Sequence, residues 1–278
     1  MSIAPDSLLL ALAPVFIASM AAEYWLLRRR GLDERYAMRD TACNIALALA
    51  QQASDKAAWF ATLPLFACLH QHRLWHIDAG WPSFIALFIA QDLLYYLFHR
   101  ASHRVRWMWA AHSVHHSSTR MNFSTALRQS PLYPLAAMWA FWLPLAWVGF
   151  EPVWIITTVL GNLALQFFVH TTLFDGFGRL SLILNTPSAH RVHHACNARY
   201  LDCNYAGVLM IWDHLFGSYI AQDPAEPCRF GTVKPVPGNN PWTVMLAEWR
   251  QILSDTRRAS GAKQRCRRLF GPPADYTK

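Results

Sequence analysis

Apolar residues fall into five long stretches along this chain, separated by short polar and basic segments. The stretches cover residues 8–27, 43–69, 82–98, 132–150 and 152–169. An α-helix needs about 20 apolar residues to cross the hydrocarbon core of a bilayer, and each stretch approaches that length. The second stretch holds charged and amide groups near its middle, so it is either a span or a partly wet interfacial helix. The pattern predicts an all-α integral membrane bundle of four to five transmembrane helices.

Basic residues give this bundle an orientation. One group of arginines follows the first apolar stretch at 28–39, and another follows the third stretch at 100–128. Segments rich in Lys and Arg stay on the cytoplasmic side of a membrane. The chain is therefore expected to be a multi-pass membrane protein with residues from 170 onward facing the cytoplasm. Because no retention signal is recognisable, we expect the bacterial inner membrane rather than the endoplasmic reticulum.

Composition agrees with a membrane environment. The 278 residues are 54% hydrophobic and only 15% charged, which is too apolar for an ordinary water-soluble domain. The net charge of +8 comes from segments beside the apolar stretches, which favours lipid head groups over nucleic acid as the partner. We expect residues 1–245 to form one membrane domain and residues 246–278 to form a peripheral helix and a basic tail.

Nine of the thirteen histidines lie in four groups that the predicted topology puts on one side of the membrane. Spacings of three and four residues return side chains to one face of a helix. Neutral imidazole binds iron, zinc and copper, and nine imidazoles fit two ions with four or five ligands each. The sequence therefore predicts a two-metal site formed by His99, His103, His112, His115, His116, His170, His190, His193 and His194. His70, His72 and His76 lie in the predicted outside loop and are expected to be solvated.

Polar residues inside two apolar stretches lead toward these histidines. Gln91 and Tyr95 precede His99 at steps of four, and Asn162 and Gln166 precede His170 in the same way. Polar groups within a membrane face the bundle interior, and a ligating histidine needs a partner that fixes its tautomer. The expected supporting partners are Gln91, Asp92, Asn162, Gln166 and Asp213.

Two further expectations concern segments near the histidines. The segment 204–219 is predicted to form a cytosolic helical cap over the metal site, where Asp213 fixes a ligand, while neighbouring His214 only packs. Arg120 and Arg128 either bind a lipid phosphate near the site or are ordinary cytoplasmic charges.

The histidine groups resemble the boxes of the fatty acid hydroxylase/sterol desaturase superfamily of membrane di-iron enzymes. The resemblance runs over residues 95–219, through FHRASH at 98–103, HSVHHSS at 112–118, NTPSAHRVHH at 185–194 and NYAGVLMIWDHLFGSY at 204–219. Carried over to this chain, the family's metal ligands fall on the nine histidines named above. NFSTALRQS at 122–130 is most similar to the alkylglycerol monooxygenase branch, which cleaves ether lipids with a pterin reductant. Bacterial members of the sterol desaturase type resemble the chain equally well.

The resemblance implies an oxidoreductase that uses O2 and two Fe to hydroxylate or desaturate a C–H bond of a lipid or sterol. The alternatives are an ether-lipid (alkylglycerol) cleaving monooxygenase and a non-redox zinc-binding membrane protein, since imidazole sites also accept zinc. A zinc hydrolase would carry HExxH, and no histidine in this chain is followed by Glu. The chain shows no fused redox domain, so the electron donor is expected to be a separate protein or a diffusible reductant.

Overall fold

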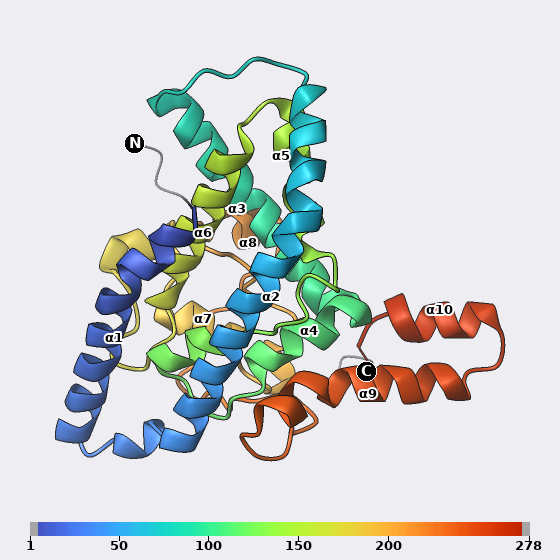
Figure 1. Cartoon of the computed structure of the whole chain (residues 1–278). Coiled ribbons are helices and arrows are strands. Elements are labelled where there is room, and N and C mark those ends of the chain that lie inside the picture. The colour runs from blue at the N-terminus through green and yellow to red at the C-terminus, as the bar shows by residue number, and fades with distance from the viewer. Residues whose placement is uncertain (1–4, 274–278) are drawn as a thin grey trace.

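Helices make up all the regular structure of the chain (Figure 1). The computed structural model describes residues 5–273, and the side chains of residues 5–7, 9 and 10 lie outside that description. Within the described residues there is no strand, only two isolated β-bridges. The prediction of an all-α fold is therefore confirmed.

Four long helices form the upper and left parts of the molecule in Figure 1: α1 Pro5–Arg29, α2 Met38–Gln71, α3 Trp81–Arg104 and α6 Pro152–Phe167. They coincide with four of the five predicted apolar stretches, although the stretch 8–27 includes two residues whose side chains are not described. Among the described helices, α3 is long and apolar enough to cross a membrane. The number of membrane-crossing helices stays a prediction.

The apolar stretch 132–150 does not form one helix, contrary to expectation. Residues 131–137 are turns, followed by the 3-10 helix η3 Met138–Trp142 and the short helix α5 Leu143–Val148. Pro131 and Pro134 cannot donate the backbone hydrogen bonds of a helix, and Ala137 adopts a left-handed φ of 57°. High hydrophobicity identified this stretch, but its prolines decide its conformation.

A tight turn after α5 reverses the chain into α6. Gly149 has a φ of 137°, and a Cβ there would lie 2.2 Å from the Trp75 carbonyl oxygen. Leu74 and Trp75 donate backbone hydrogen bonds to the carbonyls of Trp147 and Val148. Only glycine can accommodate this close approach between the turn and the loop after α2.

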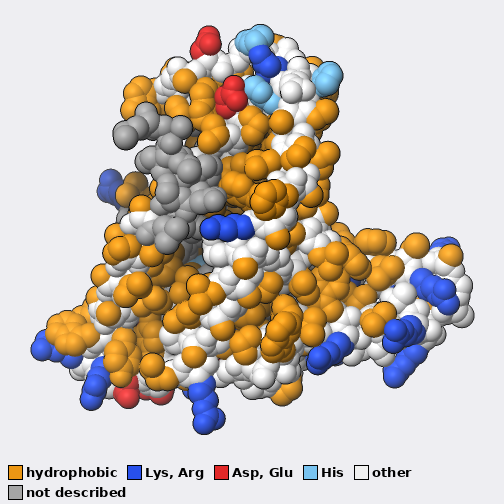
Figure 2. All heavy atoms as spheres, in the orientation of Figure 1, with side chains coloured by type: hydrophobic (Ala, Val, Ile, Leu, Met, Phe, Trp, Pro, Cys, Tyr) orange, Lys and Arg blue, Asp and Glu red, His pale blue; other side chains and the backbone are white. Residues whose placement is uncertain are grey.

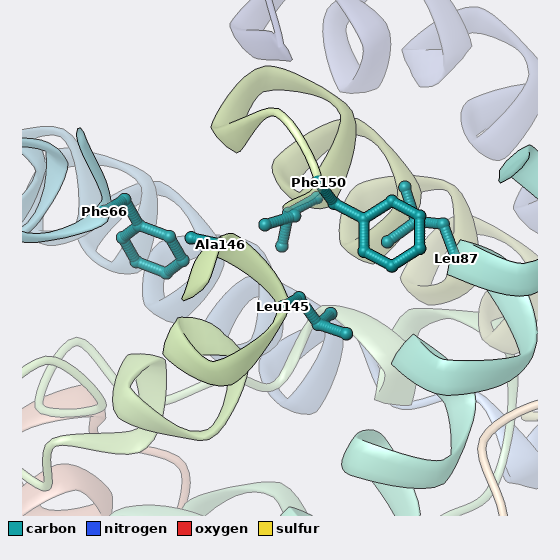
Figure 3. Close-up of a cluster of buried hydrophobic side chains, with 6 residues drawn as sticks. Phe66, Leu87, Leu145, Ala146 and Phe150 are labelled. Carbon is teal, nitrogen blue, oxygen red and sulfur yellow. The ribbon is translucent and has the colours of Figure 1, made fainter. Parts of the chain in front are cut away.

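Buried side chains from α2, α3, α5 and α6 meet in one apolar cluster at the upper end of the molecule (Figure 3). Its members are Phe66, Leu87, Leu145, Ala146, Phe150 and Ile155. The outer faces of the same helices are also apolar, since Phe60 is 87% and Leu49 67% exposed. Figure 2 shows hydrophobic side chains over most of the visible face, with most Lys and Arg at its lower edge and on the lateral hairpin. Exposed apolar surface of this extent is typical of a surface that contacts lipid or another protein.

The lower half of the molecule contains shorter helices. They are η1 Asp33–Arg35, α4 Arg106–His116, η2 Phe123–Leu127, η4 Gly178–Leu182, α7 Pro187–His193, η5 Ala198–Tyr200 and α8 Ile211–Leu215. Two last helices, α9 Pro241–Arg258 and α10 Ala262–Phe270, form a hairpin that projects to one side (Figure 1). The predicted peripheral helix lies within α9, and part of the predicted basic tail forms α10.

A buried arginine joins α9 to α4. Arg106, which is 2% exposed, donates from Nε to Glu248 at 2.8 Å and pairs through a terminal nitrogen with Asp255 at 2.8 Å. Removing one partner of a buried ion pair leaves the others desolvated without compensation. The hairpin is thus held against the helix that carries three of the nine histidines.

Substituting Arg106 by Ala is expected to lower the free energy of unfolding by about 3 kcal/mol, because both carboxylates lose their partner. The measurement is the thermal unfolding of purified chain in detergent. Arg199 forms a more exposed pair with Asp223 and serves as the matched control. Arg199→Ala should leave the melting temperature unchanged, and an equal effect of both substitutions would contradict the special role of Arg106.

Candidate metal centre

Four segments bring the nine histidines together in the protein interior. They come from the end of α3, from α4, from the residues just after α6, and from α7 with the residue that follows it. The side chains form a group of five, His99, His103, His112, His116 and His193, and a group of four, His115, His170, His190 and His194. The structure therefore collects all nine histidines that the sequence singled out, and divides them as two metal ions would require.

Distances within the groups fit ions held between the rings. Each residue offers one ligand atom, and within a group these atoms all lie within 4.8 Å of one another. Neighbouring Nε2 atoms are closer: 2.9 Å for His99 and His112, and 2.8 Å for His170 and His190. Two imidazole nitrogens about 2.1 Å from one ion lie about 3 Å apart when adjacent and about 4.2 Å when opposite. The two groups also touch, since the His116 and His194 rings stack at 4.3 Å.

Backbone carbonyls fix which ring nitrogen carries the proton. The Nδ1 atoms of His99 and His193 donate to the carbonyls of Tyr205 and Cys203 at 2.8 and 2.9 Å. In the same way His170 donates to the Gln166 carbonyl at 2.8 Å. A neutral imidazole that donates from Nδ1 has its free lone pair on Nε2. The Nε2 atoms therefore present lone pairs to the interior of each group.

Facing lone pairs repel one another unless a cation lies between them. His115 also donates from Nδ1, to the Arg128 carbonyl at 3.2 Å, and its Nε2 lies 3.1 Å from the Nε2 of His170. Among the described residues, the Nε2 of His193 has no hydrogen-bond partner at all. Buried polar atoms are normally satisfied, so these unsatisfied acceptors indicate a metal that would accept their lone pairs.

Burial keeps these imidazoles neutral. All nine are at most 5% exposed. Desolvation lowers the pKa of His193 to about 4, and it lowers the pKa of His116 and His194 well below the ordinary value, with further lowering from neighbouring histidines. Neutral imidazole is the form that binds a metal. The donor set thus fits divalent transition metals, of which iron and zinc are both suited to nitrogen ligands.

Asp213 acts on the site through the backbone. Its carboxylate accepts hydrogen bonds from the backbone nitrogens of Tyr205 and Ala206, at 2.9 and 2.7 Å, and from the Ser218 hydroxyl. The Tyr205 carbonyl in turn accepts from His99. Asp213 therefore orients the backbone of Tyr205, and this backbone orients the His99 ring. The sequence suggested that Asp213 fixes a ligand directly, whereas Tyr205 lies between them. His214 is exposed and stacks on Tyr219 at 4.4 Å, away from the groups.

The polar stripes on α3 and α6 hold the segment 205–212 rather than the rings themselves. Asp92 accepts from Asn162, from the backbone nitrogens of Val208 and Leu209, and from the Trp212 indole. Gln166 donates to Asn162 at 2.6 Å. The side chain of Gln91 is fully buried, yet neither of its polar atoms has a partner among the described residues. Within the described part of the chain, none of these four side chains forms a hydrogen bond with a clustered imidazole.

Arg128 lies in the protein interior. Its burial favours neither of the two expected roles, which were a ligand for a lipid phosphate and an ordinary cytoplasmic charge. It is 1% exposed and donates to Ser117, Asp40 and Asn44 at 2.7, 3.2 and 2.9 Å. These contacts tie α2 to the end of α4, next to His115 and His116. Asp40 and Asn44 were missed in the sequence, although their spacing of four, which puts them on one face at the start of α2, is a detectable signal.

A third missed residue is Glu23 on α1, which is 1% exposed. Its carboxylate accepts from the Tyr36 hydroxyl at 2.6 Å, from the Phe123 backbone nitrogen at 2.7 Å and from the Thr171 hydroxyl. Thr171 directly follows His170. A carboxylate in an apolar helix near bilayer depth predicts an interior partner, and here that partner is the loop after α6.

The remaining histidines stay outside the site. His72 and His76 are exposed in the loop after α2, and His70 is half-buried near Glu151, at 3.7 Å. In Figure 2 the visible histidines gather at the upper end of the molecule, far from the basic lower edge.

Comparison with known proteins identifies relatives of this chain. The human alkylglycerol monooxygenase is 44% identical over 167 residues, covering 59% of this chain and 36% of that protein. The Caenorhabditis elegans alkylglycerol monooxygenase is 32% identical over 228 residues, covering 78% of this chain and 43% of that protein. A Rhizobium tropici ornithine lipid hydroxylase is 32% identical over 164 residues, covering 53% of this chain and 45% of that protein. The chain thus spans less than half the length of these relatives. No solved structure matches it significantly.

The family comparison covers the whole site. Residues 84–218 match the model of the fatty acid hydroxylase family. This segment begins in α3, ends just after α8, and includes all nine clustered histidines. Over residues 84–218, the chain therefore carries a domain of the fatty acid hydroxylase family.

Proposed function

We propose that this protein is a membrane-bound, two-metal oxygenase that inserts oxygen into a C–H bond of a lipid beside an ether oxygen. The nine histidines are proposed as the ligands, five for one ion and four for the other. The observation that carries the proposal is the packing of nine buried imidazoles into two groups, in which the Nε2 lone pairs of His115 and His170 face each other at 3.1 Å, because a cation between them would relieve their repulsion. Two irons are the proposed metals, with zinc as a substitute, and the electrons come from outside the chain.

The bound metals would supply oxygen activation, and the protein's own residues supply ligands, orientation and exclusion of water. Buried imidazoles hold their tautomers through the carbonyls of Tyr205, Cys203, Gln166 and Arg128. The proposed reaction needs no separate nucleophile from the protein. A dry site also protects reactive species from side reactions with solvent.

Membrane placement rests on the apolar outer faces of α2 and α3 and on the distribution of charge. Basic side chains gather at the lower edge in Figure 2, beneath a broad apolar face. In this arrangement α3 crosses the bilayer and ends at its cytoplasmic surface, where His99 and His103 begin the site. The substrate is accordingly a membrane lipid that does not need to leave the bilayer.

An ether lipid is favoured over other lipids by the alkylglycerol monooxygenase relatives, since the human protein is 44% identical over 59% of this chain, against 32% over 53% for the ornithine lipid hydroxylase. Oxygenation of the carbon beside an ether oxygen gives a hemiacetal. The hemiacetal breaks into an aldehyde and an alcohol, so C–H hydroxylation and ether cleavage are one reaction for such a substrate. The second candidate, hydroxylation of an intact lipid, is favoured by the ornithine lipid hydroxylase relative.

Loss of one ligand from either group is expected to remove metal and activity together. His193 belongs to the group of five and His115 to the group of four. His193→Ala and His115→Ala should each lower the iron bound per chain, measured by elemental analysis of iron-supplemented protein, and abolish lipid oxidation. His72→Ala is the control, because His72 is exposed outside both groups. A fully metal-loaded, active His193→Ala variant would refute the ligand set.

Removing the Asp213 carboxylate is expected to weaken metal binding without removing a ligand. Asp213→Ala frees the backbone nitrogens of Tyr205 and Ala206, so His99 loses its fixed orientation, and metal affinity should fall by about 10–100-fold. The measurement is iron retained during dialysis against increasing chelator. His214→Ala, on the same helix but exposed, should retain iron normally. Equal retention by both variants would show that Asp213 only stabilises the segment 204–219.

The proposed substrate is tested with a 1-O-alkylglycerol, isotope-labelled O2 and a tetrahydropterin as reductant. We expect a fatty aldehyde that carries one labelled oxygen, detected by mass spectrometry, because the hemiacetal oxygen stays with the alkyl carbon. The His193→Ala variant is the matched control for background oxidation. A labelled hydroxyl on a lipid whose ether bond remains intact would instead support the second candidate.

A further inference from the structure

The α9–α10 hairpin carries much more positive than negative charge. Residues 241–270 contain seven Lys and Arg and two carboxylates. Both carboxylates, Glu248 and Asp255, are engaged by Arg106 of α4. Figure 2 shows the basic side chains gathered on the part of the molecule that projects to one side. The outward-facing charge of the hairpin is therefore almost entirely positive.

The helix α10 combines this charge with an exposed apolar face. Ala262, Cys266 and Phe270 repeat every four residues and so share one side, and all three are exposed, Phe270 to 56%. Its basic residues cover the rest of the helix: Lys263, Arg265, Arg267 and Arg268. None of these four pairs with a carboxylate within residues 5–273. A helix with a basic face and an exposed apolar face is typical of those that lie in a membrane surface.

The fold holds this helix next to the end of the membrane-crossing helix. α3 ends at Arg104 and α4 begins at Arg106, whose side chain binds α9 and whose backbone nitrogen donates to the Gly271 carbonyl at 3.0 Å. The Trp107 ring contacts those of Trp249 and Phe270, at 4.8 and 6.3 Å. In Figure 1, α10 lies level with α4, beside the lower part of α3. The hairpin is thus already ordered where lipid head groups would surround the end of α3.

We infer that α10 is a docking surface for anionic phospholipid head groups of the same bilayer. Phosphate groups match the unpaired Lys and Arg side chains, and the exposed side of Ala262, Cys266 and Phe270 enters the interface between head groups and acyl chains. Each basic residue at an anionic surface favours association by about fivefold. The inference rests on the membrane placement proposed above, but not on the metals or the reaction.

Cys266 offers a native probe, because it is exposed on the apolar side of α10. The full chain is reconstituted in nanodiscs of phosphatidylcholine alone, or of phosphatidylcholine mixed with phosphatidylglycerol. Reaction of Cys266 with a water-soluble maleimide is followed by peptide mass spectrometry. We expect alkylation to be several-fold slower in the anionic discs, and this difference to disappear at high salt.

Two variants separate charge from folding. Lys263→Gln combined with Arg265→Gln, Arg267→Gln and Arg268→Gln should abolish the difference between the two lipids. Arg265→Lys with Arg267→Lys and Arg268→Lys retains the charge and should retain the difference. Loss of the difference in both variants would indicate that altered helix structure, not charge, is responsible, and would overturn the inference.

Other outcomes are equally decisive. Equal alkylation of Cys266 in both disc types would overturn the inference. Equal protection that depends on protein concentration would also overturn it, because it would identify a second copy of the chain as the occupant. A chain that inserts in neither type of disc would contradict the membrane placement itself. That result is distinguishable from an inserted chain whose Cys266 reacts equally in both lipids.

Discussion

Nine neutral imidazoles lie together inside this protein, and the Nε2 lone pairs of His115 and His170 face each other at 3.1 Å, a separation that neutral groups alone do not favour. Four of the nine have their Nδ1 proton committed to a backbone carbonyl, as for His99 with Tyr205 and His193 with Cys203. Rotating a ring to relieve the repulsion would break such a hydrogen bond in a buried setting, at a cost of about 1–3 kcal/mol for each group left unsatisfied. The arrangement is therefore stable only if the surrounding backbone is held firmly and a cation can bind.

Buried charged side chains hold that backbone from several directions. Asp40 on α2 binds Arg128, whose carbonyl accepts from His115. Glu23 on α1 binds Thr171, the residue after His170. Each contact joins an apolar helix to a loop that positions an imidazole. The long helices thus contribute more than an apolar surface, because their few polar residues support the loops that carry the clustered histidines.

The segment 204–219 supports the site from the opposite side. The carboxylates of Asp92 and Asp213 each accept hydrogen bonds from backbone N–H groups of this segment. Together they fix the backbone around Tyr205 against α3. Gly207 lies so close to α3 that a Cβ would be 2.7 Å from the Tyr95 ring. The helix α4 is held in turn by Arg106 and the α9–α10 hairpin. The histidine groups, the long helices and the hairpin therefore form one connected structure.

The sequence by itself determined the all-α class, most helix positions and the nine clustered histidines, because helical periodicity and repeated His spacings are local properties of the chain. It could not determine that residues 131–150 break into turns and short helices, or that Arg128 is buried. Only the tertiary structure decided how the histidines divide into five and four, since that division depends on contacts between residues as distant as His99 and His193. The carbonyls that fix the tautomers were equally hidden, because every residue has one and only the fold decides which of them meets a ring.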